Sequence, residues 1–303
     1  MKIAYLLFIY KNPQLIKKTV DFLSCADATF FVHIDAKVPL GQFDSLRGEN
    51  VVFIQKRISV YWAEFSGVEA ILHLMREALA FPQRFDYFVL LSGSEFPLRS
   101  RQYIHQYLET NRGCEFITMM KMPAPGKPLA RLNTLRYPST RPVLRFVFRI
   151  LAKFGLAQRN YRKHLGELEP YSGLTWWALS REACQYVLEF TQKHPELARF
   201  CTNIHAPEET YIHTILGNSP FKPRIRRNLV FEDWSQQKGT GPQMIKPHHV
   251  SYFESQEEVS VQDLHGPGEQ LFARKLADET LALTSRITAM IEKKEKLPQS
   301  DGH

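Results

Sequence analysis

The chain has 303 residues, of which 44% are hydrophobic, 12% aromatic and 23% charged. This composition is typical of a globular protein and excludes a disordered, collagenous or coiled-coil chain. The 39 Lys and Arg residues outnumber the 31 Asp and Glu residues and leave a net charge of +8. Such a surplus favours anionic partners, which include nucleotides, phospholipid headgroups and nucleic acid.

The sequence predicts neither a membrane span nor a cysteine-based site. The longest apolar run, residues 3–10, is far shorter than the roughly 20 residues of a membrane span, and we interpret it as a buried first strand. The four cysteines lie far apart and form no Cys-x-x-Cys pair. We therefore expect reduced thiols and no zinc site or disulfide framework.

The first hundred residues alternate apolar runs with amphipathic segments. Buried strands are predicted at residues 3–9, 30–34, 51–54 and 87–91, and a helix is predicted to begin near Pro13. Ser66 and Glu69 have the spacing of a capping box, and Ser100 has the form of a helix cap. This alternation predicts a mostly parallel sheet with helices on both faces, which binds ligands beyond the carboxyl ends of its strands.

The alternation is interrupted between about residues 122 and 169 and then resumes. The remaining expected elements are a strand at 171–179, helices at 181–194 and 207–216, a strand at 229–234, and a final helix from about 270 to 294. Internal repeats and Gly- or Ser-rich linkers are absent from the sequence. We therefore expect one α/β domain over residues 1–303.

Several familiar catalytic motifs are missing from the sequence. It contains no Gly-x-Ser-x-Gly, His-Glu-x-x-His, Walker A or Gly-x-Gly-x-x-Gly motif, and no Asp-x-Asp pair that would hold a divalent cation on a sugar nucleotide. His248 and His249 are potential metal ligands, but adjacent histidines point in different directions. We expect no bound metal.

Eight short segments together resemble glycosyltransferase family 14. This family includes core-2/I-branching β-1,6-N-acetylglucosaminyltransferases and peptide O-xylosyltransferases. In chain order the segments are 4–5 (AY), 33–37 (HIDAK), 60–62 (VYW), 91–98 (LSGSEFPL), 207–209 (PEE), 218–221 (NSPF), 233–234 (DW) and 271–275 (LFARK). Each segment is weak evidence alone, but their shared order covers nearly the whole chain.

The resemblance implies a GT-A fold and an inverting, metal-independent transfer from a UDP-sugar to a glycan hydroxyl, with formation of a β-linkage. We expect N-acetylglucosamine or xylose as the sugar and no cofactor. Residues 1–120 would form the nucleotide-binding half, 121–170 a basic insertion, and 171–303 the acceptor and catalytic half. Such chemistry needs a base for the acceptor hydroxyl and cations for the departing diphosphate.

Glu209 is the candidate base, because it matches the second acidic residue of the family's Pro-Asp-Glu segment. Glu208 replaces the family's Asp, is expected near the acceptor, and is the alternative base. Pro207 would place both at a helix N-terminus, where the helix dipole favours an ionised carboxylate. The alternative is that these acidic residues only stabilise the helix.

Three cations are candidates for binding the diphosphate in place of Mg²⁺. Lys275 and Arg274 match the family's late basic pair, and Lys246 falls near its other cation. The alternative for Arg274 is a solvated basic face on the last helix.

Four further residues match positions of the family's substrate site. Asp35 and Tyr61 correspond to nucleotide contacts, and Glu95 stands where the family has an Asp near the donor sugar. Trp234 matches an aromatic residue of the acceptor site, where a ring can stack on a sugar.

The segment 141–164 contains seven basic side chains and no acidic one. Arg141, Arg145, Arg149 and Lys153 recur every four residues, and apolar residues cover most of the rest of this predicted helix. This pattern is typical of an interfacial helix on an anionic membrane. The alternatives are a solvated helix packed on the domain and a nucleic-acid patch, although phenylalanines suit acyl chains better than bases.

Animal members of the family are Golgi membrane proteins with stems and disulfides, whereas this chain begins at its first predicted strand. We therefore expect a bacterial, cytoplasmic member that works at the inner face of the membrane on a lipid-linked saccharide for a surface polysaccharide, and we expect no nucleic-acid partner. The alternatives are a non-catalytic membrane or nucleic-acid binding protein on the same fold and another nucleotide-sugar enzyme such as an epimerase. The missing glycine fingerprint argues against the epimerase.

Overall fold

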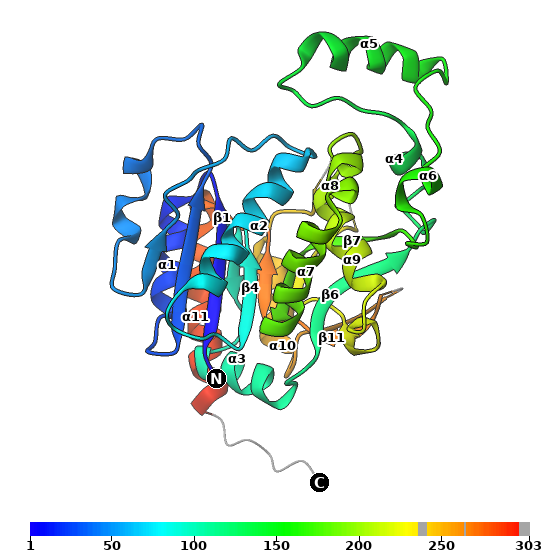
Figure 1. The fold of residues 1–303 in the computed structure, drawn as a ribbon. Coiled ribbons are helices and arrows are strands. Elements are labelled where there is room, and N and C mark those ends of the chain that lie inside the picture. The colour runs from blue at the N-terminus through cyan, green and yellow to red at the C-terminus, as the bar shows by residue number, and fades with distance from the viewer. Residues whose placement is uncertain (236–240, 264, 297–303) are drawn as a thin grey trace.

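The computed structural model describes residues 1–235, 241–263 and 265–296, and a seven-stranded sheet lies at its centre (Figure 1). The strand order is β3-β2-β1-β4-β7-β6-β8. The strands are β1 (Ile3–Ile9), β2 (Ala28–Ile34), β3 (Val51–Phe53), β4 (Tyr87–Leu91), β6 (Glu115–Lys121), β7 (Tyr171–Ser180) and β8 (Ile225–Arg226). The first four strands run parallel, and β7 runs antiparallel to both its neighbours. The mostly parallel central sheet expected from the sequence is therefore confirmed.

Helices cover both faces of this sheet, with α2 and α7 together over one face and α1 and α11 on the other (Figure 1). The longer helices are α1 (Pro13–Leu23), α2 (Phe65–Ala80), α3 (Arg101–Thr110), α5 (Pro142–Lys153), α7 (Arg181–Lys193), α8 (Pro195–Cys201), α9 (Tyr211–Gly217), α10 (Pro247–Ser255) and α11 (Leu281–Lys296). The short ones are α4 (Ala130–Asn133), α6 (Arg162–Leu165), η1 (Leu40–Leu46), η2 (Pro207–Glu209), η3 (Lys222–Arg224) and η4 (Asp278–Thr280). Because helices cover both faces, β1 and β2 are buried almost throughout.

A second, three-stranded sheet lies just beyond the carboxyl end of β4. It consists of β5 (Glu95–Pro97), β12 (Phe272–Arg274) and β9 (Val230–Glu232), with β12 in the middle. Phe96 and Ala273 from this sheet pack in a hydrophobic cluster with residues of α1, α10 and α11. The remaining strands, β10 (Ser260–Asp263) and β11 (Gly266–Glu269), pair antiparallel. The second sheet fixes Glu95, Glu232 and Arg274 next to one another.

Three of the expected elements are wrong in part. The final helix begins at Leu281 rather than near residue 270, because Phe272–Arg274 pairs as a strand with β5 and β9. The capping box at Ser66 is absent, since α2 begins at Phe65 and the Ser66 hydroxyl instead accepts a hydrogen bond from the Tyr61 amide. The expected helix at 207–216 is broken at Thr210 into η2 and α9.

Residues 122–168, here called the arm, leave the main sheet after β6 and return at β7. The arm contains α4, α5 and α6, and α5 lies at the top of Figure 1, at the outer end of the arm. No residue of α5 is buried. Within the described residues, no helix combines the length and the hydropathy that crossing a membrane requires.

Candidate active site

The loops that follow β1, β2 and β4 bring the first group of candidate residues to the carboxyl edge of the sheet. Asp35 follows β2, and its amide donates to the carbonyl of Ile9 at the end of β1. Lys37 Nζ lies 2.9 Å from Asp35 Oδ2 and 4.5 Å from the centre of the Tyr61 ring. Asp35 and Tyr61 therefore lie together, with Lys37 between them.

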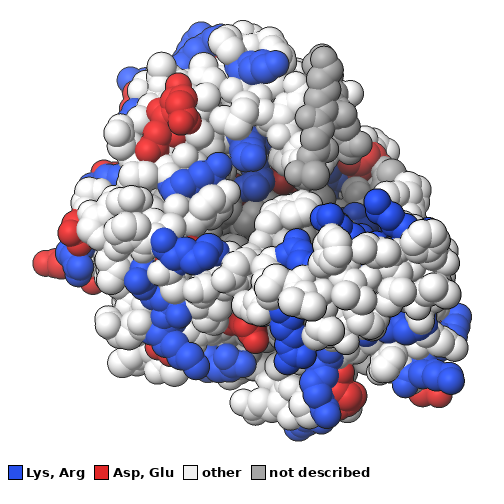
Figure 2. Space-filling view, turned by 90° about the horizontal axis from the view of Figure 1, so that it is seen from above, with Lys and Arg blue, Asp and Glu red and all other residues white. Residues whose placement is uncertain are grey.

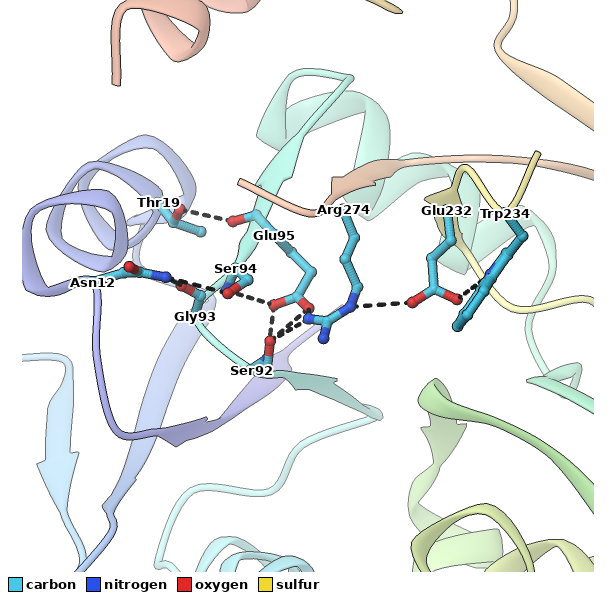
Figure 3. Close-up of polar contacts among 9 residues, drawn as sticks. All are labelled: Asn12, Thr19, Ser92, Gly93, Ser94, Glu95, Glu232, Trp234 and Arg274. Carbon is cyan, nitrogen blue, oxygen red and sulfur yellow. Dashed lines mark hydrogen bonds and ion pairs between the residues drawn. The ribbon is translucent and has the colours of Figure 1, made fainter. Parts of the chain in front are cut away.

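Glu95 is enclosed by a tight turn at the end of β4 (Figure 3). Its carboxylate accepts hydrogen bonds from the Ser92 amide at 2.7 Å, from the Ser92 hydroxyl at 2.8 Å and from the Ser94 amide at 3.2 Å. Gly93 within this turn has a φ of 76°, and a Cβ there would lie 2.6 Å from Ile16 Cδ1. Glycine is required at this position for both reasons.

Arg274 lies between two carboxylates (Figure 3). Its Nη1 pairs with Glu95, and its Nε lies 3.1 Å from Glu232 Oε1. The side chains of Glu95, Glu232 and Arg274 are 0%, 5% and 14% exposed. The guanidinium also lies 4.5 Å from the centre of the Trp176 ring. Arg274 is thus neutralised within the protein, and we call Glu95, Arg274 and Glu232 the Arg274 cluster.

The Arg274 cluster contains one more carboxylate than cations. Burial raises the pKa of Glu232, and the neighbouring Arg274 opposes this rise. Glu232 also accepts a hydrogen bond of 3.3 Å from the indole of Trp234. Trp234 is partly exposed at the rim of the cluster, so its ring remains open to contact from outside.

Lys275 and Lys246 come together through their backbones. The Ile245 amide donates a 2.8 Å hydrogen bond to the Lys275 carbonyl, which places the start of α10 beside the end of β12. Burial lowers the pKa of the Lys275 ammonium, and the positive charges of Lys11 and Arg274 lower it further. Among the described residues, no carboxylate forms an ion pair with Lys275, Lys246 or Lys11. Lys275 and Lys11 lie close enough for their charges to interact, and Lys246 follows the residue that contacts Lys275.

Glu209 lies between two cations of the arm. Its Oε2 is 2.6 Å from Arg131 Nη1 and also pairs with the ammonium of Lys127. Lys127 donates in addition to the carbonyl of Gly173 at 2.7 Å. Burial alone would raise the pKa of Glu209, but the two ion pairs outweigh it and lower that pKa. We call Glu209, Lys127 and Arg131 the Glu209 cluster.

The ionised state of Glu209 has a different cause from the helix dipole that the sequence predicts. The residue sits in a three-residue 3₁₀ turn and not in the first turn of a longer helix, so its charge is stabilised by Lys127 and Arg131 rather than by a helix dipole. The Glu209 side chain is 28% exposed, and solvent reaches it.

Glu208 differs from its neighbour in burial and charge partners. Its Oε2 is buried without a hydrogen-bond partner, and burial raises its pKa to about 7. Glu208 therefore has the higher proton affinity of the two, whereas Glu209 is the one paired with cations.

The two clusters and the lysines share one edge of the molecule. The charge of Glu209 contributes to the raised pKa of Glu232, so the two carboxylates interact electrostatically. The Ala206 amide donates 3.2 Å to the Ala63 carbonyl, which ties the Glu209 turn to the Tyr61 loop. Seen from above, this face has a hollow near its centre, with Lys and Arg side chains around it (Figure 2).

His249 is an internal contact of this region. Its Nδ1 accepts a 2.9 Å hydrogen bond from the Lys246 amide, and its Nε2 therefore carries the proton that it donates to Asp233 at 2.9 Å. Burial would raise the pKa of Asp233, but the hydrogen bonds from His249 and Ser235 hold it at about 2. In the described part of the chain, no group of three or more His, Cys, Asp or Glu side chains is placed to hold a metal ion.

Sequence reasoning missed four residues of this site: Lys127, Arg131, Glu232 and Lys11. Glu232 directly precedes the Asp-Trp segment 233–234, which the sequence analysis had already placed in the site. Lys127 and Arg131 are four residues apart in the irregular segment after β6. That spacing predicts a shared face but not which carboxylate they contact.

Comparison with known proteins supports the resemblance seen in the sequence. A family model described as Core-2/I-branching enzyme matches residues 3–257. Xylosyltransferase 2 of Rattus norvegicus is 24% identical over 263 residues, which covers 79% of this chain and 27% of that protein. A probable β-1,3-galactosyl-O-glycosyl-glycoprotein β-1,6-N-acetylglucosaminyltransferase 7 of Sus scrofa is 22% identical over 259 residues, which covers 82% of this chain and 58% of that protein.

Both relatives are longer than the part that this chain matches. Among solved structures, the apo form of mouse xyloside xylosyltransferase 1 matches with a TM-score of 0.38 and 11% identity, over 90% of this chain and 96% of that one.

Proposed function

The chain belongs to the Core-2/I-branching enzyme family, and from this premise we propose that it transfers a sugar from a UDP-sugar to a glycan hydroxyl with inversion to a β-linkage. The observation that carries the proposal is one edge of the fold that holds both an accessible, ionised carboxylate, Glu209, and lysines without carboxylate partners among the described residues. Inverting transfer requires these two groups, a base and an anion-binding set of cations.

In the proposed reaction, Glu209 accepts the proton of the acceptor hydroxyl while the hydroxyl oxygen attacks the anomeric carbon of the donor. The bond from that carbon to the diphosphate oxygen breaks, and UDP leaves with the bonding electron pair. Lys275 and Lys246 stabilise the negative charge that develops on the diphosphate, as a divalent cation would. We therefore propose that the reaction needs no metal.

Asp35 and Tyr61 are proposed to contact the nucleotide, and Trp234 and Glu208 to border the acceptor. For Glu95 and Arg274 we propose a role other than the expected donor contacts, because their charged groups face each other. We assign them to shaping the floor of the site next to the lysines rather than to direct contact with the diphosphate or the sugar.

The names of the relatives support N-acetylglucosamine or xylose as the transferred sugar. A lipid-linked saccharide is the proposed acceptor, and this part rests on membrane contact by α5. The bacterial origin and the cytoplasmic location stay predictions.

A thermal-shift panel of nucleotides and nucleotide sugars in EDTA tests the donor. We expect UDP and one UDP-sugar to raise the melting temperature, because a ligand that binds only the folded state stabilises it by mass action. Release of UDP on addition of a glycan acceptor, again in EDTA, then tests transfer. Stabilisation only by CMP- or GDP-linked sugars would contradict the donor, and strict dependence on Mn²⁺ would contradict the metal-free mechanism.

A further inference from the structure

Helix α5 presents an apolar face to solvent. Val143, Phe146 and the C-cap residue Phe154 are 75%, 58% and 74% exposed, and Val147 and Ile150 are exposed as well. Their spacing of three and four residues places them on one side of the helix. Contiguous exposed apolar surface of this kind marks an interaction site.

The opposite side of α5 faces the rest of the molecule. Arg145 Nη1 lies 2.8 Å from Glu64 Oε1, just before α2, and the ring of Phe148 lies 4.7 Å from that of Tyr137. Ala152 lines a cavity together with Trp62 and His205, and Arg149, at the boundary between the two sides of the helix, lines its rim. These contacts fix the rotation of α5, so that its apolar face points away from the body.

Basic side chains border this apolar face. Arg149 and Lys153 are exposed beside it, and Arg162 and Lys163 are exposed further along the arm. Residues 141–164 contain no acidic residue. An apolar face with adjacent cations matches the boundary between acyl chains and anionic headgroups, because the cations reach the phosphates while the rings enter the apolar layer.

A second copy of the chain fits this surface less well. Pairing two α5 helices through their apolar faces would bring two sets of arginines and lysines together, and like charges at an interface oppose association. A nucleic acid would engage the cations but leave the phenylalanines without an apolar partner.

The position of α5 relates this surface to the candidate active site. β1 rises from the N-terminus, so the carboxyl ends of β1, β2 and β4 point toward the side on which α5 lies (Figure 1). That side is the one with the hollow and its ring of Lys and Arg (Figure 2). A surface that contacts α5 would lie over the same side of the molecule as Glu209.

We propose that α5 docks on an anionic lipid bilayer, with Val143, Phe146, Val147, Ile150 and Phe154 in the headgroup–acyl boundary and Arg149 and Lys153 on the lipid phosphates. Docking in this way turns the carboxyl edge of the sheet toward the membrane. The inference uses the geometry and charge of the arm and does not depend on the transfer reaction.

Vesicle flotation tests this directly. The full chain is mixed with vesicles of phosphatidylcholine alone or with one third phosphatidylglycerol, at 50 and 500 mM NaCl. We expect the wild type to float with the anionic vesicles at low salt and to remain unbound with phosphatidylcholine. Phe146→Ser/Phe154→Ser and Arg149→Glu/Lys153→Glu should each lower the bound fraction at least tenfold.

The controls alter similar side chains elsewhere on the surface. Lys293→Glu/Lys296→Glu changes charge at the far end of α11, and Leu40→Ser removes an exposed apolar side chain of η1. Both should bind like the wild type. All altered side chains are exposed, and equal melting temperatures would show that the variants fold.

Three results would overturn the proposal. One is equal flotation of the wild type and of Phe146→Ser/Phe154→Ser, and another is binding to phosphatidylcholine alone that salt does not weaken. The third is no flotation together with a dimer that the serine pair converts to a monomer in light scattering, which would assign the face to a second copy.

Discussion

The Arg274 cluster and the Glu209 cluster are built from the same chemical groups in opposite proportions. In the first, one guanidinium lies between two carboxylates and all three side chains are nearly closed to solvent. In the second, one carboxylate lies between two cations, and it is partly open. The first therefore carries an excess negative charge and the second an excess positive charge.

Under the proposed function, this difference separates a structural role from a chemical one. A buried guanidinium between two carboxylates fixes the local structure, and its removal leaves uncompensated charge. A half-open carboxylate next to cations can meet a substrate while staying ionised. The sequence segments alone place Glu209 as the base and Glu95 and Arg274 as donor contacts, and they do not show that Glu95 and Arg274 pair with each other.

The largest effect is expected for the rate of transfer when the Glu209 cluster is altered. Glu209→Gln should lower the rate of transfer by about 10²–10⁴-fold, because a general base contributes roughly this factor. The affinity for UDP, measured by calorimetry, should stay unchanged. Glu208→Gln is the matched control and should cost much less; near-normal turnover of Glu209→Gln with a severe loss in Glu208→Gln would move the role of base to Glu208.

Substitution in the Arg274 cluster should lower the free energy of unfolding. Arg274→Ala leaves Glu95 and Glu232 without their cation and should cost about 3–5 kcal/mol of unfolding free energy, measured with urea. Arg286→Ala breaks the exposed pair with Glu254 and should cost far less. A stability loss in Arg274→Ala no greater than in this control would mean that the cluster does not hold the site together.

The same variant has a pH signature. Burial already raises the pKa of Glu232, and loss of Arg274 should raise it further. A carboxyl whose pKa is higher in the folded state destabilises the fold above its unfolded pKa, and the penalty falls as it takes up a proton. The difference between the wild type and Arg274→Ala should therefore shrink as the pH is lowered toward 5.

The lysines should affect donor binding by a smaller factor. Lys275→Ala should weaken UDP binding by about 10- to 100-fold, since a hydrogen bond to a charged group contributes about 1.5–3 kcal/mol. Lys193→Ala, an exposed lysine on α7, serves as the control. Equal UDP affinity in both variants would remove Lys275 from the diphosphate site.

The smallest effect is expected on the pH at which kcat/KM falls on the acid side. Lys127 lowers the pKa of Glu209, so Lys127→Ala should raise that pKa and move the acid limb of kcat/KM to higher pH. Lys163→Ala, an exposed lysine of the same arm, should leave the limb in place. An acid limb that does not move in Lys127→Ala would show that Glu209 does not control it.

The sequence predicted best those elements whose signal is local. β1, β2 and β4 are continuous apolar runs because the sheet is covered on both faces. The hydroxyls of Ser100 and Ser180 cap α3 and α7 by contacts three residues away. Such short-range patterns need no knowledge of the rest of the fold.

Elements and contacts that depend on distant partners could not be predicted. β12 has only three residues, and its partners β5 and β9 lie far away in the chain, so the local sequence predicts the start of a helix there. Glu95 and Arg274 are 179 positions apart, and Lys127 and Glu209 are 82. The sequence could nominate these charged residues, but the fold alone determines which of them neutralise each other.

Both cations of the Glu209 cluster belong to the arm, whereas Glu209 lies on the body of the molecule. Thermodynamic coupling of this kind is reciprocal. Any contact that favours a displaced arm must raise the proton affinity of Glu209, and protonation of Glu209 must loosen the arm by the same free energy. The position of the arm and the protonation of Glu209 are therefore thermodynamically linked.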